Sequence, residues 1–375
     1  MIFNSFVAKT LRDDLILTNH LVLYLSMLKR LFIFLLFIPF TVAAQFHISG
    51  RVIDLVTKKP VADASVLLTN SSAGTKANND GTFTINNVRE GQYELIISVI
   101  GYETYHKTVM VNKDVNLGDV GIFQQSILLN EVRIGPDKHW AEHYAHFKKV
   151  FLGTTDNSSE CDIINPHVLN FFNDKGNFTA NAEGFLEIEN KALGYRIKYM
   201  LVTFSDNANT NRMYYAGRAF FEDMPGNKRQ LKRWKKNRDL TYFGSDMHFY
   251  RSIIDNRVKE NGFTVRRLIR RPNPDYKGGN DIKYIQTLVT IPLATDEFST
   301  FTNEHGVFAL KFKDCLNIIY KDNGLSASIL TIDGDYALFD NNGVLLNPES
   351  IVMEGNWGQN RMADMLPVDY ESSQE

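Results

Sequence analysis

Residues 92–99 (QYELIISV) decide the fold, because apolar side chains alternate along them with the period of two that an extended strand requires. Tyr93, Leu95, Ile97 and Val99 share one face of such a strand. Residues 82–85 (TFTI) repeat the alternation after the turn at 78–81 (NNDG), whose Asp-Gly pair suits a tight hairpin because Gly tolerates positive φ. Turn residues recur about every eight to twelve positions, so residues 46–125 are predicted to form a small sandwich of antiparallel strands.

Five short motifs give this sandwich a family resemblance. They are ISGRVID at 48–54, KPVADASV at 59–66, DGTFTI at 80–85, GQY at 91–93 and IGY at 100–102. Together they resemble the carboxypeptidase-like regulatory domain. The resemblance implies a transthyretin-like, carbohydrate-binding-like sandwich of about seven strands. It also implies a module that is not itself catalytic and that elsewhere precedes TonB-dependent outer-membrane receptors.

The N-terminal residues predict export. Residues 27–44 (MLKRLFIFLLFIPFTVAA) combine a basic start, an apolar run and small final residues, which is the pattern of a secretory signal peptide. A retained membrane anchor is the alternative, although the run is shorter than the ~20 apolar residues that span a bilayer. Residues 1–26 fit no part of a signal peptide, so they are predicted to be an over-called start, with Met27 as the true one. Cleavage after Ala44 would leave Gln45 first, in the periplasm or on the periplasmic face of the outer membrane.

Residues 126–138 are predicted to be a linker strand between two domains. Within the linker, residues 128–134 (LLNEVRI) resemble the short strand that follows the sandwich in those receptors. A connecting edge strand and a docking segment for an energising partner are both open interpretations of this strand.

Residues 139–375 are predicted to form a β-rich α+β domain with a helical insertion at 227–260. Trp140, Tyr144, Phe147 and Phe151 recur on one helical face and indicate its first helix. Strand-like runs occur at 184–189, 195–204, 213–221, 264–269, 284–291, 307–312, 316–320, 328–332 and 337–339. The whole chain is therefore predicted to be mainly β with some α.

Four motifs in this second domain carry a further resemblance. They are ALGY at 192–195, YFGS at 242–245 with HF at 248–249, ENGF at 260–263 and LPVDY at 366–370. They resemble an uncharacterised C-terminal region that accompanies the same sandwich in bacterial envelope proteins. That region has no assigned reaction, so the resemblance implies none here.

A candidate metal site lies at residues 139–143 (HWAEH). The residues fit the H-x-x-E-H pattern, in which two histidines four apart on a helix bind zinc and the glutamate polarises water. His146 falls near the same face, because seven residues make about two helical turns. A peptidase of this kind also needs a carboxylate from a second helix, and the sequence shows no such helix nearby. We therefore predict no metal and no cofactor, with a zinc hydrolase using His139, Glu142 and His143 as the alternative.

A basic run lies in the helical insertion. Seven of the eleven residues at 228–238 (KRQLKRWKKNR) are basic: Lys228, Arg229, Lys232, Arg233, Lys235, Lys236 and Arg238. Such charge density suits contact with an anionic surface such as phospholipid or lipopolysaccharide headgroups. The alternative is a solvated helix face that Leu231 and Trp234 dock onto the fold.

Serine, aspartate and cysteine residues provide only weak evidence for a catalytic site, a calcium site or a disulfide. The G-x-S-x-G pattern is absent from the sequence, and Ser245 is predicted to lie within a helical segment. Asp333 and Asp335 make only half of a calcium site. Cys161 and Cys315 are predicted either to pair in an oxidising periplasm or to remain as two buried thiols. No catalytic residue is therefore assigned.

Composition and net charge exclude some classes of function. The 375 residues carry 41 Lys+Arg and 43 Asp+Glu, a formal net charge of −2, which excludes nucleic-acid binding driven by overall charge. The sequence predicts an exported, non-enzymatic binding or assembly module of the cell envelope. Its expected partner is an envelope protein or outer-membrane component, with a glycan or an anionic lipid surface as alternatives and no nucleic acid. A glycan-binding module using exposed aromatics such as Tyr102 and Tyr105 is the second alternative beside the zinc hydrolase.

Overall fold

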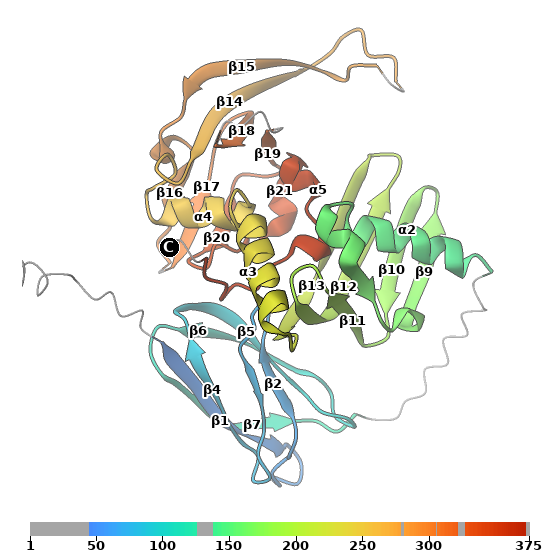
Figure 1. Ribbon diagram of the computed structural model, residues 1–375, viewed down its shortest axis with the longest axis vertical. Coiled ribbons are helices and arrows are strands. Elements are labelled where there is room, and N and C mark those ends of the chain that lie inside the picture. The colour runs from blue at the N-terminus through green and yellow to red at the C-terminus, as the bar shows by residue number, and fades with distance from the viewer. Residues whose placement is uncertain (1–44, 126–137, 279–280, 305, 322–326, 373–375) are drawn as a thin grey trace, which may run out of the picture. The chain divides into compact units, whose positions relative to one another are not determined.

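The computed structural model describes residues 45–125, 138–278, 281–304, 306–321 and 327–372. The predicted signal peptide at 27–44, the over-called start at 1–26 and all but the last residue of the linker at 126–138 lie outside these ranges. Residues Gln45–Glu375 form one compact unit, in which strands predominate over helices (Figure 1). The prediction of a mainly β protein with some α is thus confirmed.

The first seven strands form the predicted sandwich. One sheet has the order β4-β1-β7, from β1 (Phe46–Asp54), β4 (Thr82–Val88) and β7 (Val115–Ile122). The other has the order β3-β2-β5-β6, from β2 (Ser65–Leu68), β3 (Gly74–Lys76), β5 (Gly91–Ser98) and β6 (Tyr105–Val111). The pairing of β1 with β7 is parallel, so the prediction of antiparallel strands throughout is wrong at this pair. The reason is that the chain crosses from the other sheet between β6 and β7, so β7 arrives beside β1 in the same direction.

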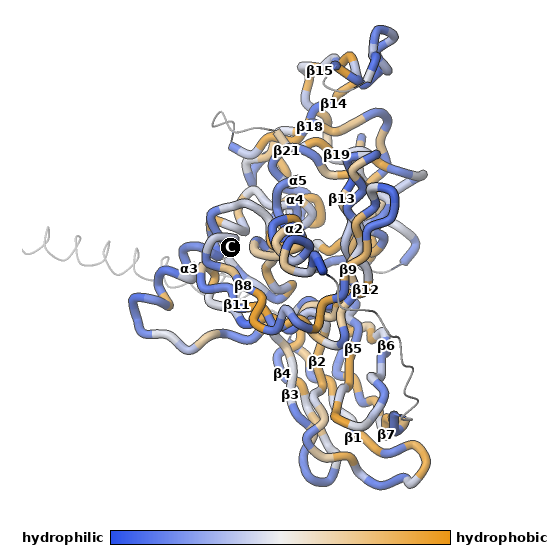
Figure 2. Tube along the Cα trace, turned by 90° about the vertical axis from the view of Figure 1, so that its right-hand side faces the viewer, coloured by the Kyte–Doolittle hydropathy of each residue, from blue (hydrophilic) through white to orange (hydrophobic). Residues whose placement is uncertain are grey.

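The sandwich core contains the side chains whose alternation predicted it. Tyr93, Leu95 and Ile97 on β5 are buried together with Ile48 on β1, and the alternation of apolar and polar residues is visible along the sandwich strands (Figure 2). Ile96, on the opposite face of β5, is also only 3% exposed. The outer face of this sheet is therefore covered as well, which a simple alternation does not predict.

A helix on a six-stranded sheet follows. The helix is α2 (Trp140–Leu152), and the sheet has the order β8-β11-β12-β10-β9 with β13 paired to β12. The strands are β8 (Cys161–Ile163), β9 (Leu169–Asp174), β10 (Asn177–Ala182), β11 (Phe185–Asn190), β12 (Tyr195–Asn207) and β13 (Arg212–Asp223). Phe147 and Phe151 of α2 are fully buried against this sheet, and Trp140 and Tyr144 are partly buried beside them. The predicted apolar face of the first helix is thus confirmed.

The helical insertion consists of α3 (Lys228–Tyr242) and α4 (Asp246–Ile254), and two smaller sheets follow it. The five-stranded sheet has the order β15-β14-β18-β19-β21, and the three-stranded sheet has the order β16-β17-β20. Their strands are β14 (Phe263–Pro272), β15 (Tyr284–Pro292), β16 (Ser299–Phe301), β17 (Val307–Leu310), β18 (Cys315–Tyr320), β19 (Ser328–Ile332), β20 (Ala337–Asp340) and β21 (Ile351–Gly355). A short helix, α5 (Asn356–Gln359), follows β21. None of the helices in the described ranges has the length and apolar content needed to cross a membrane.

Backbone groups of the sandwich accept hydrogen bonds that join it to the rest of this unit. Residues 366–371, which we call the C-terminal strap, also contribute to this connection. The amide N–H of Phe221 on β13 donates to the carbonyl of Ser71 at 3.0 Å. From the strap, the N–H of Val368 donates to the carbonyl of Asn70 at 2.7 Å, and the Val368 side chain is buried in the sandwich core. On the outer face of the β5 sheet, Arg218 of β13 pairs with Glu94.

Candidate functional site

The histidines of α2 are engaged by neighbouring side chains. His139 Nδ1 lies 3.3 Å from Glu142 Oε2, with both side chains exposed. The ring of His143 packs against Phe178 of β10 with 5.6 Å between centroids. His146 Nε2 lies 2.8 Å from Asp206 Oδ2 on β12.

This arrangement does not converge on a metal ion. A zinc site needs three or four ligand atoms within about 2.0–2.3 Å of one point. His146 is directed to its own carboxylate, Asp206. Among the described residues, no three His, Cys, Asp or Glu side chains are grouped closely enough to hold a metal ion.

The basic run forms most of α3, and a polar cap explains where the helix begins. Asn227 accepts hydrogen bonds from the N–H groups of Arg229 and Gln230, at 3.1 and 3.0 Å. The Gln230 side chain accepts in return from the N–H of Asn227 at 2.9 Å. This reciprocal capping box satisfies orphan donors of the first turn.

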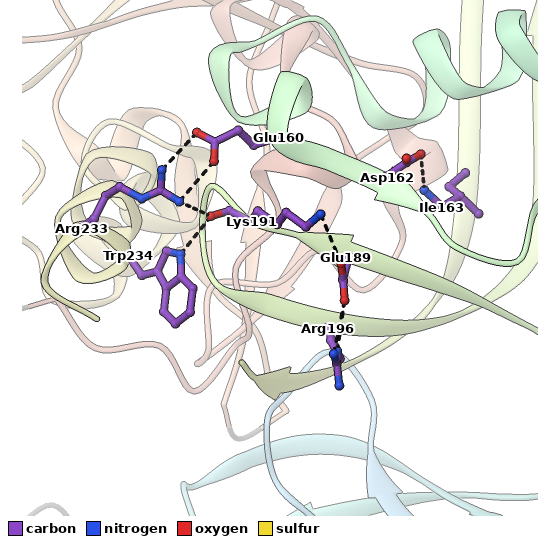
Figure 3. Close-up of polar contacts among 8 residues, drawn as sticks. All are labelled: Glu160, Asp162, Ile163, Glu189, Lys191, Arg196, Arg233 and Trp234. Carbon is purple, nitrogen blue, oxygen red and sulfur yellow. Dashed lines mark hydrogen bonds and ion pairs between the residues drawn. The ribbon is translucent and has the colours of Figure 1, made fainter. Parts of the chain in front are cut away.

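Trp234 is the side chain that anchors α3. It is 4% exposed, and its indole N–H donates to the carbonyl of Lys191 at 2.9 Å (Figure 3). Its ring lies so close to Gly194 that a Cβ there would come within 2.2 Å of it, and Gly194 also has a φ of +73°. Leu231 is 51% exposed, so the interpretation that it docks the helix together with Trp234 is wrong for Leu231.

Two of the seven basic residues are used within the fold. Arg233 lies 3.1 Å from Glu160 and donates to the carbonyl of Lys191 at 2.8 Å (Figure 3). Arg238 pairs with Asp223 at 2.7 Å and lies over the ring of Tyr195, 3.7 Å from its centroid. Both guanidinium groups therefore hold α3 to the sheet.

The other five basic residues lie on one exposed stripe, which we call the basic face of α3. They are Lys228, Arg229, Lys232, Lys235 and Lys236, all exposed. At about 100° per residue their positions span an arc of about 120° of the helix. Within the described ranges none of the five has a carboxylate partner, so their charges face solvent.

A hollow of about 310 Å³ lies beside this face. It is lined by Trp234, Lys235 and Arg238 of α3, by residues at the ends of β12 and β13, by Ser72 of the sandwich and by the C-terminal strap. Asp369 of the strap accepts from the hydroxyl of Ser72 at 2.6 Å, and the hydroxyl of Tyr370 donates to Asp239 at 2.7 Å. Burial, followed by the hydrogen bond to Asp239, raises the pKa of Tyr370 above its ordinary value.

These contacts make the hollow a joint between segments far apart in the sequence. The polar groups of its wall are directed at one another, and the tyrosine is neutral at physiological pH. Sequence reasoning identified LPVDY at 366–370 only as a resemblance. The sequence offers only an apolar valine between a proline and two polar residues, which does not indicate where the segment docks.

The remaining candidate residues have structural roles. Ser245 lies in the turn between α3 and α4, where its hydroxyl accepts from the N–H of His248 at 3.1 Å; the prediction that it lies within a helix is wrong, because Ser245 is the N-cap of α4. Asp333 pairs with Arg212 at 2.8 Å. Cys161 and Cys315 are free and buried, and burial raises the pKa of the Cys161 thiol to about 12. Tyr102 and Tyr105 pack, partly buried, against the sandwich core.

One comparison with known proteins concerns the sandwich. Residues 48–134 match the model of a family described as the CarboxypepD_reg-like domain, which confirms the resemblance seen in the motifs. No curated protein matched the sequence.

The chain was also compared with solved structures, and three of those that resemble part of it are the following. The pilus 2b backbone protein of group B streptococcus is 19% identical over 22% of this chain and 42% of its own, with a TM-score of 0.19. A type II cohesin–X-dockerin complex from Acetivibrio cellulolyticus is 22% identical over 22% and 58%, with a TM-score of 0.19. The 3-chlorocatechol 1,2-dioxygenase of Rhodococcus opacus is 10% identical over 22% and 60%, with a TM-score of 0.18. The chain thus covers less than two thirds of each of these structures.

Proposed function

Residues 48–134 match the CarboxypepD_reg-like domain model, and from this premise we propose that the protein is an exported, non-enzymatic binding module of the cell envelope. The basic face of α3 is its contact with an anionic surface such as lipid or lipopolysaccharide headgroups. The protein partner we propose is an envelope protein or outer-membrane component located at the same anionic surface. The predicted signal peptide at 27–44 supports a location in the periplasm or on the periplasmic face of the outer membrane.

The observation that carries this proposal is that the basic residues of α3 fall into two groups with different contacts. Arg233 and Arg238 hold the helix in place, whereas the five side chains of the basic face are exposed and have no carboxylate partner among the described residues. Their position also argues against a role in stability. Lys228 and Arg229 occupy the first turn, which has no acidic residue, and positive charge at a helix N-terminus is unfavourable by about 0.3–1 kcal/mol.

A non-enzymatic role is supported by how the candidate catalytic groups are used. His139 contacts Glu142 of the same helix, whereas His146 and His143 contact Asp206 and Phe178 of the sheet. Ser245 caps a helix, and the Cys161 thiol stays protonated near neutral pH. Each of these side chains is explained by packing or hydrogen bonding.

Liposome co-sedimentation tests the basic face. The mature chain from Gln45 is expected to sediment with anionic but not with neutral vesicles at low salt, and to be released as salt rises and the screening length falls from about 30 Å at 0.01 M to about 10 Å at 0.1 M. Replacing all five residues of the basic face with Gln should weaken this binding about a hundredfold or more, since each basic residue near an anionic surface contributes about 1 kcal/mol. The variant should unfold at the same or a higher temperature, because the first turn loses its unfavourable charges.

The matched control removes five exposed lysines elsewhere. Lys58, Lys59, Lys107, Lys113 and Lys259 are exposed, and replacing them with Gln changes the net charge by the same amount. This control should sediment like the unmodified chain. Equal loss in both variants, or no binding of the unmodified chain to anionic vesicles at low salt, would contradict the proposal.

A further inference from the structure

The strand β15 presents a free and unusually exposed edge. It is the outermost strand of its sheet and pairs only with β14 in the described ranges (Figure 1). Along Tyr284–Pro292, all residues but one are exposed. Ile291 is 73% exposed, Ile285 53% and Leu288 42%, so the strand offers apolar side chains on both of its faces.

Most proteins protect such an edge, and β15 has little of the usual protection over residues 284–288. Native edge strands are typically short, charged, interrupted or covered, because unpaired N–H and C=O groups are a template for another strand. β15 has nine residues (YIQTLVTIP), none of them charged. Its only proline is its last residue. Its ladder with β14 is regular from Tyr284 to Leu288, and the register shifts between Leu288 and Pro292, where Arg266 Nε donates to the carbonyl of Thr290 at 3.2 Å.

Positive charge surrounds this neutral strand. Residues 263–292 contain six basic and two acidic residues. Two of the basic groups are paired, Arg267 with Asp314 and Arg270 with Glu354. Within the described ranges the other four, Arg266, Arg271, Lys277 and Lys283, have no carboxylate partner. Arg266 lies opposite Pro292 in the ladder and Arg271 opposite Ile285, so both ends of β15 are flanked by positive charge.

We propose that the free edge of β15 binds an extended acidic polypeptide segment by strand addition. The backbone of such a segment supplies partners for the outward N–H and C=O groups, apolar side chains of the segment contact Ile285, Leu288 and Ile291, and its carboxylates meet Arg266, Arg271 and Lys283. This surface belongs to different elements from α3, so the inference does not rest on the proposed function.

Charge and hydrogen bonding favour this occupant over two others. A second copy paired edge to edge would place two arginine-rich β14 strands about three strand spacings apart, roughly 14 Å, with the same sign of charge. A lipid surface would attract the basic side chains, but acyl chains offer no partners to a row of backbone groups. An acidic strand satisfies the charges and the backbone together.

The test uses a fluorescent synthetic peptide of about nine residues in which valine alternates with aspartate and glutamate, matched to the length of β15. Binding to the mature chain is followed by anisotropy, and hydrogen exchange locates the site. The acidic peptide should bind about tenfold or more tightly than the same peptide with lysine in place of its acidic residues. Exchange should slow in residues 284–292 when the acidic peptide is bound.

A pair of double variants makes the site specific. Ile285→Glu with Ile291→Glu should weaken peptide binding about tenfold or more, because it places like charges beside the bound strand. Val56→Glu with Ile100→Glu is the control, since both side chains are highly exposed, at 79% and 98%, and the change in net charge is the same. It should leave binding unaltered.

Three results would overturn the inference. The first is equal binding of the acidic and lysine peptides. The second is slowed exchange at α3 instead of β15. The third is concentration-dependent dimerisation of the chain that Ile285→Glu with Ile291→Glu abolishes, which would assign the edge to a second copy.

Discussion

His248 shows how a single polar side chain is kept neutral inside an aromatic cluster. It is 3% exposed, and its ring lies between those of Tyr242, Phe263 and Tyr320, with centroids 5.0, 4.9 and 5.6 Å away. Its Nδ1 accepts a hydrogen bond from the N–H of Gly244 at 3.1 Å. Burial, followed by the nearby charges of Lys321 and Arg251, lowers the pKa of His248 to about 4.

Stability is therefore expected to fall with acidification between about pH 6.5 and pH 4. The unfolded chain binds a proton at His248 below about pH 6.5, whereas the folded chain does so only near pH 4. At pH 5 the difference amounts to about 2 kcal/mol of lost unfolding free energy relative to pH 7. Urea unfolding at both pH values measures it.

The variant His248→Gln isolates this effect, because Gln keeps an acceptor for Gly244 and does not titrate. It should lose about 2 kcal/mol less than the unmodified chain between pH 7 and pH 5. His167→Gln, at an exposed position, should show the unmodified pH dependence. An unchanged slope in His248→Gln would show that carboxylates alone set the acid sensitivity.

At the scale of the element, periodicity predicted the long helices and most strands but not their contacts. The four aromatic residues of α2 repeat over three turns, so its buried face was readable. β9 (LNFFND) and β10 (NFTANA) were not predicted, because asparagine and alanine are depleted in strands, and the pairing of the two strands supplies the missing stabilisation. In α3, Leu231 and Trp234 were indistinguishable by spacing. Only the position of Gly194, forty residues earlier in the chain, determines that Trp234 is the one buried.

Trp234 and Leu231 should therefore differ sharply on truncation. Trp234→Ala removes a buried ring and leaves a cavity, which costs about 3–5 kcal/mol of unfolding free energy. Leu231→Ala alters a half-exposed side chain and should change it by no more than about 0.5 kcal/mol. Chemical denaturation of both variants measures the contrast. Equal losses would mean that both side chains dock the helix, as the spacing alone suggested.

At the scale of the whole molecule, the strap couples the sandwich to the rest of the compact unit. Val368 completes the sandwich core, while Arg251 of α4 donates to the carbonyls of Val368 and Tyr370 at 2.8 and 2.9 Å. The motifs predicted the sandwich itself from local sequence. The strap was beyond such reasoning, because nothing in the residues near 368 indicates which of several sheets they complete.

Val368→Asp should separate the two parts. A carboxylate at this position is buried without a partner, which costs several kcal/mol and expels the strap from the sandwich core. Calorimetry of the mature chain is expected to show one cooperative transition, and the variant should show two, the lower one below the original temperature. Val56→Asp, at an exposed position, should retain the single transition. A single, merely shifted transition in Val368→Asp would mean that other contacts couple the parts.

The hydrogen bond between Ser72 and Asp369 joins residues 297 positions apart, and this separation has a consequence for biosynthesis. At about 5–20 residues per second, a ribosome needs roughly 15–60 s to make the chain between them. The residues of the sandwich strands are synthesised well before Val368, and the sandwich core is incomplete until Val368 packs into it. The N-terminal module of this chain thus reaches its final packing after translation of the last strand, in the reverse of the usual vectorial order.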